Sequence, residues 1–239
     1  YQPIWNIETG RMVAAEALMR LIAANGAPIS PATFIPVAER TGAIVELGEW
    51  AIREACQQLM SCPGIPMISV NVSAVQIAKP TFALNVARIV SETGVAPSRL
   101  ALEITEGSEI DDSPEVLQTI ADLAALGVSV WLDDFGTGFA GLSCLSKFSF
   151  DTVKIDRLFV QATDTPRGAK LLGDMIRMLS NSGQKIILEG VETKDEVNRV
   201  RELGGVALQG YYFNRPMSAE ALTLLARKGG QLARSALAA

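Results

Sequence analysis

Short apolar runs rich in β-branched and aromatic residues alternate along this chain with longer stretches in which apolar residues recur at helical spacing. The short runs predict strands, and the longer stretches predict helices. Strands are expected at residues 2–6, 12–18, 67–73, 100–106, 128–134, 152–159, 185–192 and 208–213. Expected helices include residues 43–60, 74–92, 114–126, 167–182, 194–203 and 218–228.

Residues at the ends of the expected helices support these boundaries. Ser113 followed by Pro114 is a favourable N-cap and first-turn pair. Gly127 and Gly183 fall just past helix ends, where a residue in the left-handed conformation is favoured.

The order of the elements predicts the fold class. After an opening pair of strands, strands and helices alternate, which is typical of parallel βαβ units. The opening pair is joined by a turn around Gly10 and reads as a hairpin, so one strand is expected to run antiparallel to the rest. We therefore expect an α/β fold, a TIM-like (β/α)8 barrel with one antiparallel strand near the N-terminus. The chain has 239 residues, which is close to the usual size of that fold.

The composition narrows the choice of function. The chain has a net charge of −5 and no long basic stretch, so we expect no binding to nucleic acid polymers. The chain has no run of about 18 apolar residues, so no membrane-spanning helix is expected. Three cysteines without CxxC spacing suggest reduced thiols and a cytoplasmic location. The chain opens on a strand-like segment without Met, so residues 1–239 are expected to be one domain of a longer protein.

The chain contains no histidine. This absence excludes Ser-His-Asp catalysis, zinc sites with histidine ligands and acid–base chemistry by imidazole. Any catalysis must therefore depend on carboxylates, lysine, amides and a hard metal ion.

Polar residues suited to metal or phosphate binding stand at the ends of the expected strands. They are Glu16, Asn71, Glu103, Glu106, Asp133, Asp134, Lys154, Asp156, Glu189, Glu192 and Gln209. In a (β/α)8 barrel the carboxyl ends of the strands form the active-site face. Any one of these acids alone is more simply a solvated residue or a helix cap. A whole ring of them would repel itself unless cations neutralised it.

Oxygen ligands without histidine or cysteine are typical of Mg²⁺ or Mn²⁺ sites. Two such ions, about 4 Å apart, can clamp a phosphodiester and activate a water molecule. The residues at the strand ends therefore predict a metal-dependent site for cleaving a phosphodiester bond.

Two local motifs suggest other functions, and both are rejected. Residues 136–141 match GxGxxG, but Asp133 and Asp134 directly before them would repel a pyrophosphate. The triplet Asp134-Phe135-Gly136 is shared with protein kinases, but no HRD motif or VAIK lysine accompanies it.

Over nearly its whole length the chain resembles the EAL family of cyclic di-GMP phosphodiesterases. The resemblance runs from Tyr1-Gln2-Pro3-Ile4 to Arg215-Pro216, and it includes Glu16-Ala17-Leu18, which is followed by Arg20. The further blocks are Val70-Asn71-Val72-Ser73, Glu103-Ile104-Thr105-Glu106, Asp133-Asp134-Phe135-Gly136-Thr137-Gly138, Lys154-Ile155-Asp156, Glu189-Gly190-Val191-Glu192 and Gln209-Gly210-Tyr211. The three letters EAL alone are a weak signal, whereas this ordered set is highly specific.

The resemblance implies hydrolysis of cyclic di-GMP to linear pGpG with two Mg²⁺ or Mn²⁺ ions, and inhibition by Ca²⁺. Glu16, Asn71, Glu103 and Asp133 would hold the first metal. Asp133 and Asp134 would contribute to the second.

The resemblance assigns the remaining site residues to catalysis and substrate binding. Lys154 would orient the attacking water, and Glu189 would help to set the water network. Glu106 would anchor the loop that carries the second-metal aspartate. Arg20 would contact a substrate phosphate and Gln209 would complete the pocket. A surface ion pair with Glu16 remains the alternative role for Arg20.

Two departures from the family pattern bear on activity. The Tyr-Ser-Ser usual after the loop glycines is Phe139-Ala140-Gly141 here, and the aromatic residue usual after Arg20 is Leu21. Neither change removes a ligand, but the first could loosen the loop after Asp134. The alternative function is therefore a catalytically weak or inactive domain that binds cyclic di-GMP. A homodimer and attached sensory or GGDEF-type domains are further expectations.

Overall fold

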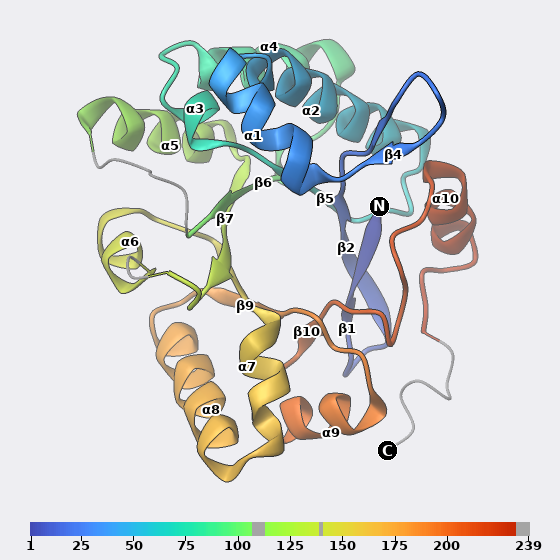
Figure 1. The fold of residues 1–239 in the computed structure, drawn as a ribbon, viewed down its shortest axis with the longest axis vertical. Helices are drawn as coiled ribbons and strands as arrows, with labels where there is room; N and C mark the ends of the chain where they lie inside the picture. The colour runs from blue at the N-terminus through green and yellow to red at the C-terminus, as the bar shows by residue number, and fades with distance from the viewer. Residues whose placement is uncertain (107–112, 139–140, 233–239) are drawn as a thin grey trace.

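Eight strands form a closed barrel in the computed structural model, which describes residues 1–106, 113–138 and 141–232 (Figure 1). Around the barrel the strand order is β1-β10-β9-β8-β7-β6-β5-β2. The strands are β1 (Gln2–Asn6), β2 (Arg11–Ala17), β5 (Ile68–Asn71), β6 (Leu100–Thr105), β7 (Ser129–Phe135), β8 (Thr152–Ile155), β9 (Lys185–Leu188) and β10 (Ala207–Leu208). The expected TIM-like barrel is confirmed.

Strand β1 runs antiparallel to both of its neighbours, β2 and β10, whereas the other neighbouring strands pair in parallel. The expected hairpin and single antiparallel strand are therefore confirmed. A separate two-stranded hairpin, β3 (Leu21–Ile22) with β4 (Pro28–Ile29), follows β2 and was not predicted.

The helices surround the barrel in Figure 1. They are α1 (Pro31–Thr41), α2 (Ile44–Ser61), α3 (Ala74–Ile77), α4 (Phe82–Thr93), α5 (Pro114–Leu126), α6 (Gly141–Lys147), α7 (Arg157–Gln161), α8 (Pro166–Asn181), α9 (Lys194–Glu202) and α10 (Ala219–Arg227). Ser113 caps α5 through Val116 N–H, and Gly127 ends that helix with φ of 88°, as the sequence predicts. Within the described ranges no helix is long and apolar enough to cross a membrane.

Four predicted boundaries are wrong by more than two residues, and each error has a local cause. The strand expected at 185–192 ends at Leu188, shortly before Gly190 turns the chain with a φ of 65°. The helix expected at 74–92 is interrupted between α3 and α4, where Pro80 lacks a backbone donor. The strand expected at 152–159 ends at Ile155 because the Asp156 side chain accepts a bond from Leu158 N–H and caps α7. The strand expected at 208–213 ends at Leu208, and the chain then turns against the backbone of Val191.

Helix α1 was also missed by the sequence analysis. Proline stands at its first residue and again inside it at Pro36, and a proline inside a helix removes one hydrogen bond. Only Phe34 and Ala38 of this helix are buried, so its apolar periodicity is short.

Apolar residues form two separate clusters. The larger one lies between the barrel strands and the surrounding helices. The smaller one contains Ile4, Ala14, Ala101, Trp131 and Ile187, which come from barrel strands only. Side chains alternate along a strand, so the positions two residues further along β2, β6 and β7 face the same inner side. Those positions are Glu16, Glu103 and Asp133, and the fold therefore brings the sequence-predicted acids together.

Two glycines of α8 provide a test of this packing. A glycine-to-alanine change inside a helix normally stabilises it by about 1 kcal/mol. A Cβ atom at Gly168 would overlap the backbone carbonyl of Ala162, whereas one at Gly173 would lie 3.3 Å from a flexible methyl of Leu203. We expect Gly168→Ala to lower the free energy of unfolding by about 2 kcal/mol. Gly173→Ala should stay within about 1 kcal/mol of the wild type. Urea unfolding followed by circular dichroism measures both, and equal stability of the two variants would contradict this packing.

Candidate metal centre

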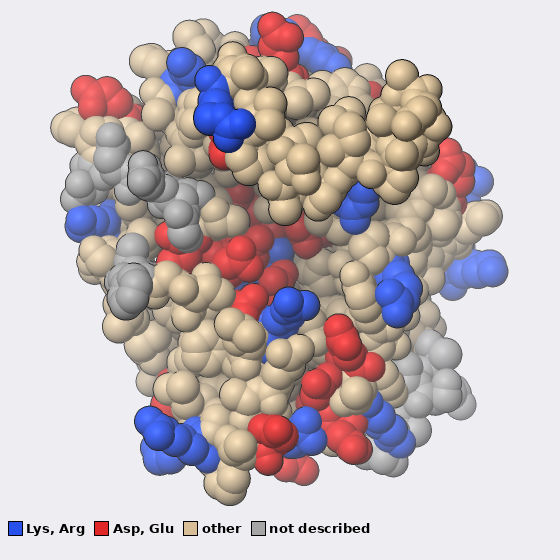
Figure 2. Space-filling model, in the orientation of Figure 1, with Lys and Arg blue, Asp and Glu red and all other residues tan. Residues whose placement is uncertain are grey.

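The acidic side chains expected at the strand ends lie together at the carboxyl end of the barrel. Glu16 comes from β2, Glu103 from β6 and Asp133 from β7, and Glu189 directly follows β9. Figure 2 looks onto this end of the barrel and shows acidic side chains gathered in a central hollow.

The ammonium group of Lys154 lies among these carboxylates. Lys154 comes from β8 and is 1% exposed. Its Nζ lies 2.6 Å from a Glu103 oxygen and 2.7 Å from a Glu189 oxygen. Asp133 and Glu16 oxygens lie 3.1 Å and 3.4 Å away. Burial alone would lower the pKa of Lys154, but the four carboxylates hold that pKa well above its usual value. A protonated lysine therefore faces four acidic groups.

Two amide side chains hold Glu16 in place. Asn71 Nδ2 and Gln209 Nε2 each donate to one oxygen of Glu16, both over 2.7 Å. Burial raises the pKa of Glu16, but Lys154 and the two amides outweigh burial and leave that pKa below its usual value. Glu16 is therefore a buried carboxylate that stays ionised.

Glu103 is in a different electrostatic situation. It has no exposed surface, and its Oε1 has no hydrogen-bond partner among the described residues. Burial raises the pKa of Glu103 well above its usual value, against the opposing effect of Lys154. A buried carboxylate oxygen without a partner is unfavourable, and a bound cation would supply the positively charged neighbour that it lacks.

Asp133, Asp134 and Glu189 form a second acidic group. Burial, followed by the charge of Asp133, raises the pKa of Asp134 to about 6. Burial likewise raises the pKa of Glu189 to about 8, although Lys154 opposes this change. Asp134 and Glu189 therefore resist ionisation, chiefly because they are buried and also because they lie near other carboxylates.

The donor set fits hard divalent cations. Among the described residues, two sets of three carboxylates have oxygens close enough to hold an ion, and Asp133 belongs to both. The first set is Glu16, Glu103 and Asp133, and the second is Asp133, Asp134 and Glu189. The second set thus includes Glu189, which the sequence analysis had placed in the water network rather than among the ligands.

The carboxylate of Glu106 contacts the loop that follows β7. Its Oε2 accepts a hydrogen bond of 2.5 Å from Gly136 N–H, two residues beyond Asp134. A Cβ atom at Gly138 would lie 2.9 Å from the other oxygen of Glu106, so the chain passes close to this carboxylate. The departures noted at Phe139 and Ala140 lie outside the described residues.

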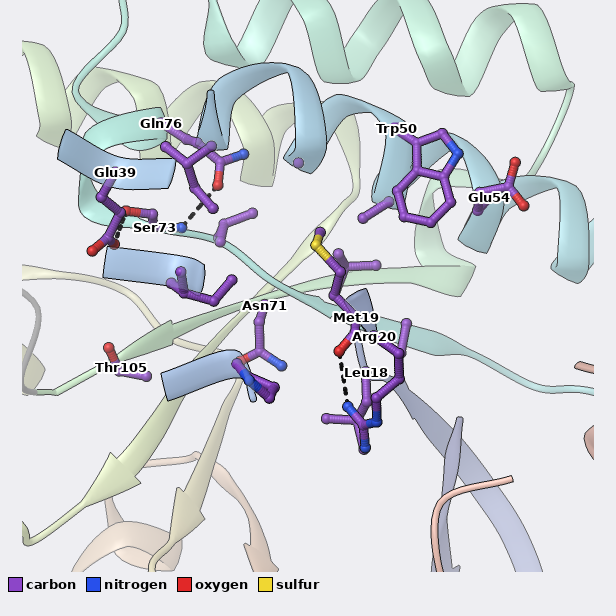
Figure 3. Close-up of a pocket in the computed structure, with 18 of the residues that line it drawn as sticks. Leu18, Met19, Arg20, Glu39, Trp50, Glu54, Asn71, Ser73, Gln76 and Thr105 are labelled. Atoms are coloured by element: carbon purple, nitrogen blue, oxygen red, sulfur yellow. Dashed lines mark hydrogen bonds between the residues drawn. The ribbon is translucent and has the colours of Figure 1, made fainter. Parts of the chain in front are cut away.

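Arg20 borders a cavity of about 550 Å³ beside the metal centre. Figure 3 shows Arg20 and Asn71 on one side of this cavity, with Glu39, Gln76 and Trp50 across from them. Arg20 Nη1 donates to the carbonyl oxygen of Met19 over 2.9 Å. It forms no ion pair with Glu16 in the described part of the chain, so the surface-ion-pair alternative is wrong.

A smaller cavity of about 210 Å³ opens directly onto the carboxylates. Its lining includes Glu16, Glu189 and Gln209, together with Arg157 and Tyr211. The guanidinium of Arg215 lies 4.4 Å from the centre of the Tyr211 ring. The sequence analysis missed Arg157, although a basic residue just beyond the end of β8 is a signal that could have identified it.

Comparison with known proteins places this barrel in a family. The model of the EAL domain matches residues 1–216. MucR of Pseudomonas aeruginosa, a bifunctional diguanylate cyclase/cyclic di-GMP phosphodiesterase, is 35% identical over 227 residues, which cover 93% of this chain and 33% of MucR. The oxygen sensor protein DosP of Escherichia coli is 36% identical over 225 residues, which cover 92% of this chain and 28% of DosP. The chain thus spans about a third or less of the length of these relatives.

Solved structures agree with the sequence comparison. The MucR phosphodiesterase in complex with c-di-GMP superposes with a TM-score of 0.85 at 35% identity, covering 93% of this chain and 92% of that one. The EAL enzyme Bd1971 bound to cAMP and cyclic-di-GMP gives a TM-score of 0.87 at 27% identity, covering 95% of this chain and 63% of that one. The resemblance stated from the sequence is confirmed: this chain belongs to the EAL domain family.

Proposed function

We propose that this domain is a metal-dependent phosphodiesterase that hydrolyses cyclic di-GMP to linear pGpG and so lowers the level of this second messenger in bacterial signalling. The observation that carries the proposal is the pair of carboxylate sets that share Asp133 around a buried lysine. A phosphodiester is the substrate that two adjacent divalent cations bind and activate together. The relative MucR is named as a cyclic di-GMP phosphodiesterase, and its phosphodiesterase has been solved with c-di-GMP.

Two Mg²⁺ or Mn²⁺ ions would occupy the carboxylate sets. Glu16, Asn71, Glu103 and Asp133 would hold one ion. Asp133, Asp134 and Glu189 would hold the other. The ions would supply an activated water nucleophile and neutralise charge on the phosphodiester.

Lys154 contributes positive charge that is fixed in place before the substrate arrives. Its ammonium group remains protonated because the surrounding carboxylates raise its pKa. In the proposed reaction it donates to the attacking water and stabilises charge that develops on the phosphoryl oxygens. Its four acidic neighbours hold it in position, so little reorganisation accompanies the reaction.

Arg20 and Gln209 are the proposed substrate-binding residues. One guanidinium nitrogen of Arg20 donates to a neighbouring carbonyl, while the side chain remains exposed at the rim of the larger cavity. A guanidinium group there suits a phosphate oxygen. Gln209 Oε1 is buried without a partner among the described residues, so it can accept a hydrogen bond from a water or substrate group in the smaller cavity.

Glu106 acts as a positioning residue in this proposal. By accepting the hydrogen bond from Gly136 N–H it holds the loop that begins at Asp134. The homodimer, the attached sensory or GGDEF-type domains and the cytoplasmic location remain predictions from the sequence.

Metal binding gives the first test. We expect two Mn²⁺ ions per wild-type chain in isothermal titration calorimetry. Asp133→Asn should lower the affinity for both ions by more than about 100-fold, because Asp133 belongs to both sets. Even the loss of a group that only hydrogen-bonds to a metal ligand costs about 10–100-fold in metal affinity. Glu189→Gln should lower the affinity for only one ion. Asp174→Asn, on the exposed surface of α8, is the matched control. If Asp133→Asn still bound two Mn²⁺ ions with wild-type affinity, Asp133 would not be a ligand shared by both ions.

The activity test combines substrate and metal. Incubation with cyclic di-GMP and Mg²⁺ or Mn²⁺ should yield pGpG, resolved by chromatography, and Asp133→Asn should yield none. Ca²⁺ should support substrate binding but little turnover, because its longer and looser coordination misplaces the attacking water. Binding of cyclic di-GMP without product in both Mg²⁺ and Mn²⁺ would reject the enzyme and leave a binding domain. Robust hydrolysis in Ca²⁺ alone would count against a geometry-sensitive two-metal reaction.

Substitution of Lys154 tests its role in the reaction. Lys154→Ala should lower kcat by about 100-fold, comparable to the loss of a donor to the transition state. Substrate affinity should change much less, because the lysine acts on the water and on developing charge. Circular dichroism in excess Mn²⁺ checks that the variant folds, since removal of the ammonium leaves buried carboxylates unpaired. A large loss of affinity with kcat unchanged would make Lys154 a phosphate anchor instead.

A further inference from the structure

A third cavity is a cleft at the opposite end of the barrel from the carboxylates, where the parallel strands begin. Its volume is about 500 Å³, and its lining comes from β1, β2, β7, β8, β9 and β10, from Ser180 of α8, and from residues just before β5, β9 and β10. We name it the lower cleft. Its size lies within the range of small-molecule sites, which is about 300–1,000 Å³.

Inner side chains of the barrel, one layer below the metal centre, line part of the lower cleft. Inner positions of such barrels usually carry bulky branched residues. Here five lining residues stand two positions before a residue of the proposed site and therefore share its inner face: Ala14, Trp131, Thr152, Ile187 and Ala207. Ala14, Trp131, Thr152 and Ile187 are at most 4% exposed, so they form the floor of the cleft.

The indole of Trp131 gives the lower cleft an aromatic wall. Trp131 is only 4% exposed and packs with Ile4, Ala14 and Ile187 inside the barrel. No described residue accepts a hydrogen bond from its indole N–H. An aromatic wall beside apolar neighbours favours a planar ring that can stack or meet it edge to face.

Two polar groups of the lower cleft lack partners. Gln184 Oε1 is buried without a hydrogen-bond partner in the described part of the chain, so it requires a donor. Lys185 lines the cleft, is exposed and forms no ion pair with any described residue. Among the described residues that line the cleft, Lys185 alone carries a charge. The cleft therefore complements an anion.

We propose that the lower cleft is a second binding site, separate from the metal centre, for a planar aromatic molecule with one negative group and one N–H or O–H donor. The ring packs against Trp131, the donor satisfies Gln184 Oε1, and the negative group lies beside Lys185. This site does not depend on the proposed phosphodiesterase activity.

The fluorescent probe 8-anilinonaphthalene-1-sulfonate tests the proposal because it carries planar rings, one sulfonate and one N–H. We expect one saturable site on the folded domain. Ser129→Phe, which places a ring in the cleft, should weaken probe affinity by at least about tenfold. Lys185→Glu should weaken it by about fivefold, while Lys185→Arg should bind as the wild type does. Lys79→Glu, an exposed lysine between α3 and α4 that does not line the cleft, is the control of matched charge.

Folding is checked separately, because this probe also binds partly unfolded proteins. Each variant must show cooperative thermal unfolding, and the exposed Lys185→Glu keeps the test decisive if Ser129→Phe fails to fold. Absence of probe binding to the folded domain would overturn the proposal. So would probe binding that Lys185→Glu leaves unchanged, or binding that Arg20→Glu abolishes, because the probe would then sit elsewhere or at the metal-centre face.

Discussion

The structure of the site depends on one imbalance of charge: a single buried ammonium group lies among four carboxylates. Lys154 stays protonated, but one positive charge cannot neutralise Glu16, Glu103, Asp133 and Glu189 together. Burial therefore keeps the pKa values of Glu103 and Glu189 high. Removing two or more ionised acids from water is costly unless cations accompany them. Divalent cations would supply the missing charge and allow the remaining acids to ionise, so the same arrangement accounts for metal binding and for a lysine held rigidly at the reaction centre.

Strand periodicity links this centre to the remainder of the barrel interior. The side chains two residues before Glu16, Glu103 and Asp133 face the same inner side, one layer lower. In that layer Ala14, Trp131 and Ile187 pack together and line the lower cleft. The barrel is therefore polar and acidic in its upper layer and apolar in the layer below. The alternation of side chains along the strands thus produces two chemically different regions, the metal centre and the lower cleft.

The sequence was sufficient for the barrel, its antiparallel strand and the gathering of Glu16, Glu103 and Asp133, because each follows from periodicity and strand order. It was insufficient where neighbouring segments decide the outcome. The end of β8 depends on capping by Asp156, and the cleft at Trp131 depends on how inner side chains fill the barrel. Alternation predicts which side a residue faces but not which atoms it meets. For that reason the sequence suggested a role for Lys154 toward water, whereas its contacts with four carboxylates appeared only in the structure.

The two carboxylate sets differ in how firmly the fold holds them. Glu103 and Asp133 lie within barrel strands, so the first set is fixed by the sheet itself. Asp134 lies inside β7 where the pairing with β8 shifts register, and its φ of 56° is unusual for a residue other than glycine. Aspartate tolerates this conformation because its side chain is short and polar. Glu106, which bonds to Gly136 N–H, and Thr137, whose hydroxyl donates to the Asp134 carbonyl over 2.8 Å, hold the turn in place. The second set therefore depends on the irregular end of β7, which a few hydrogen bonds maintain, and a change that loosens this end affects the second ion before it affects the first.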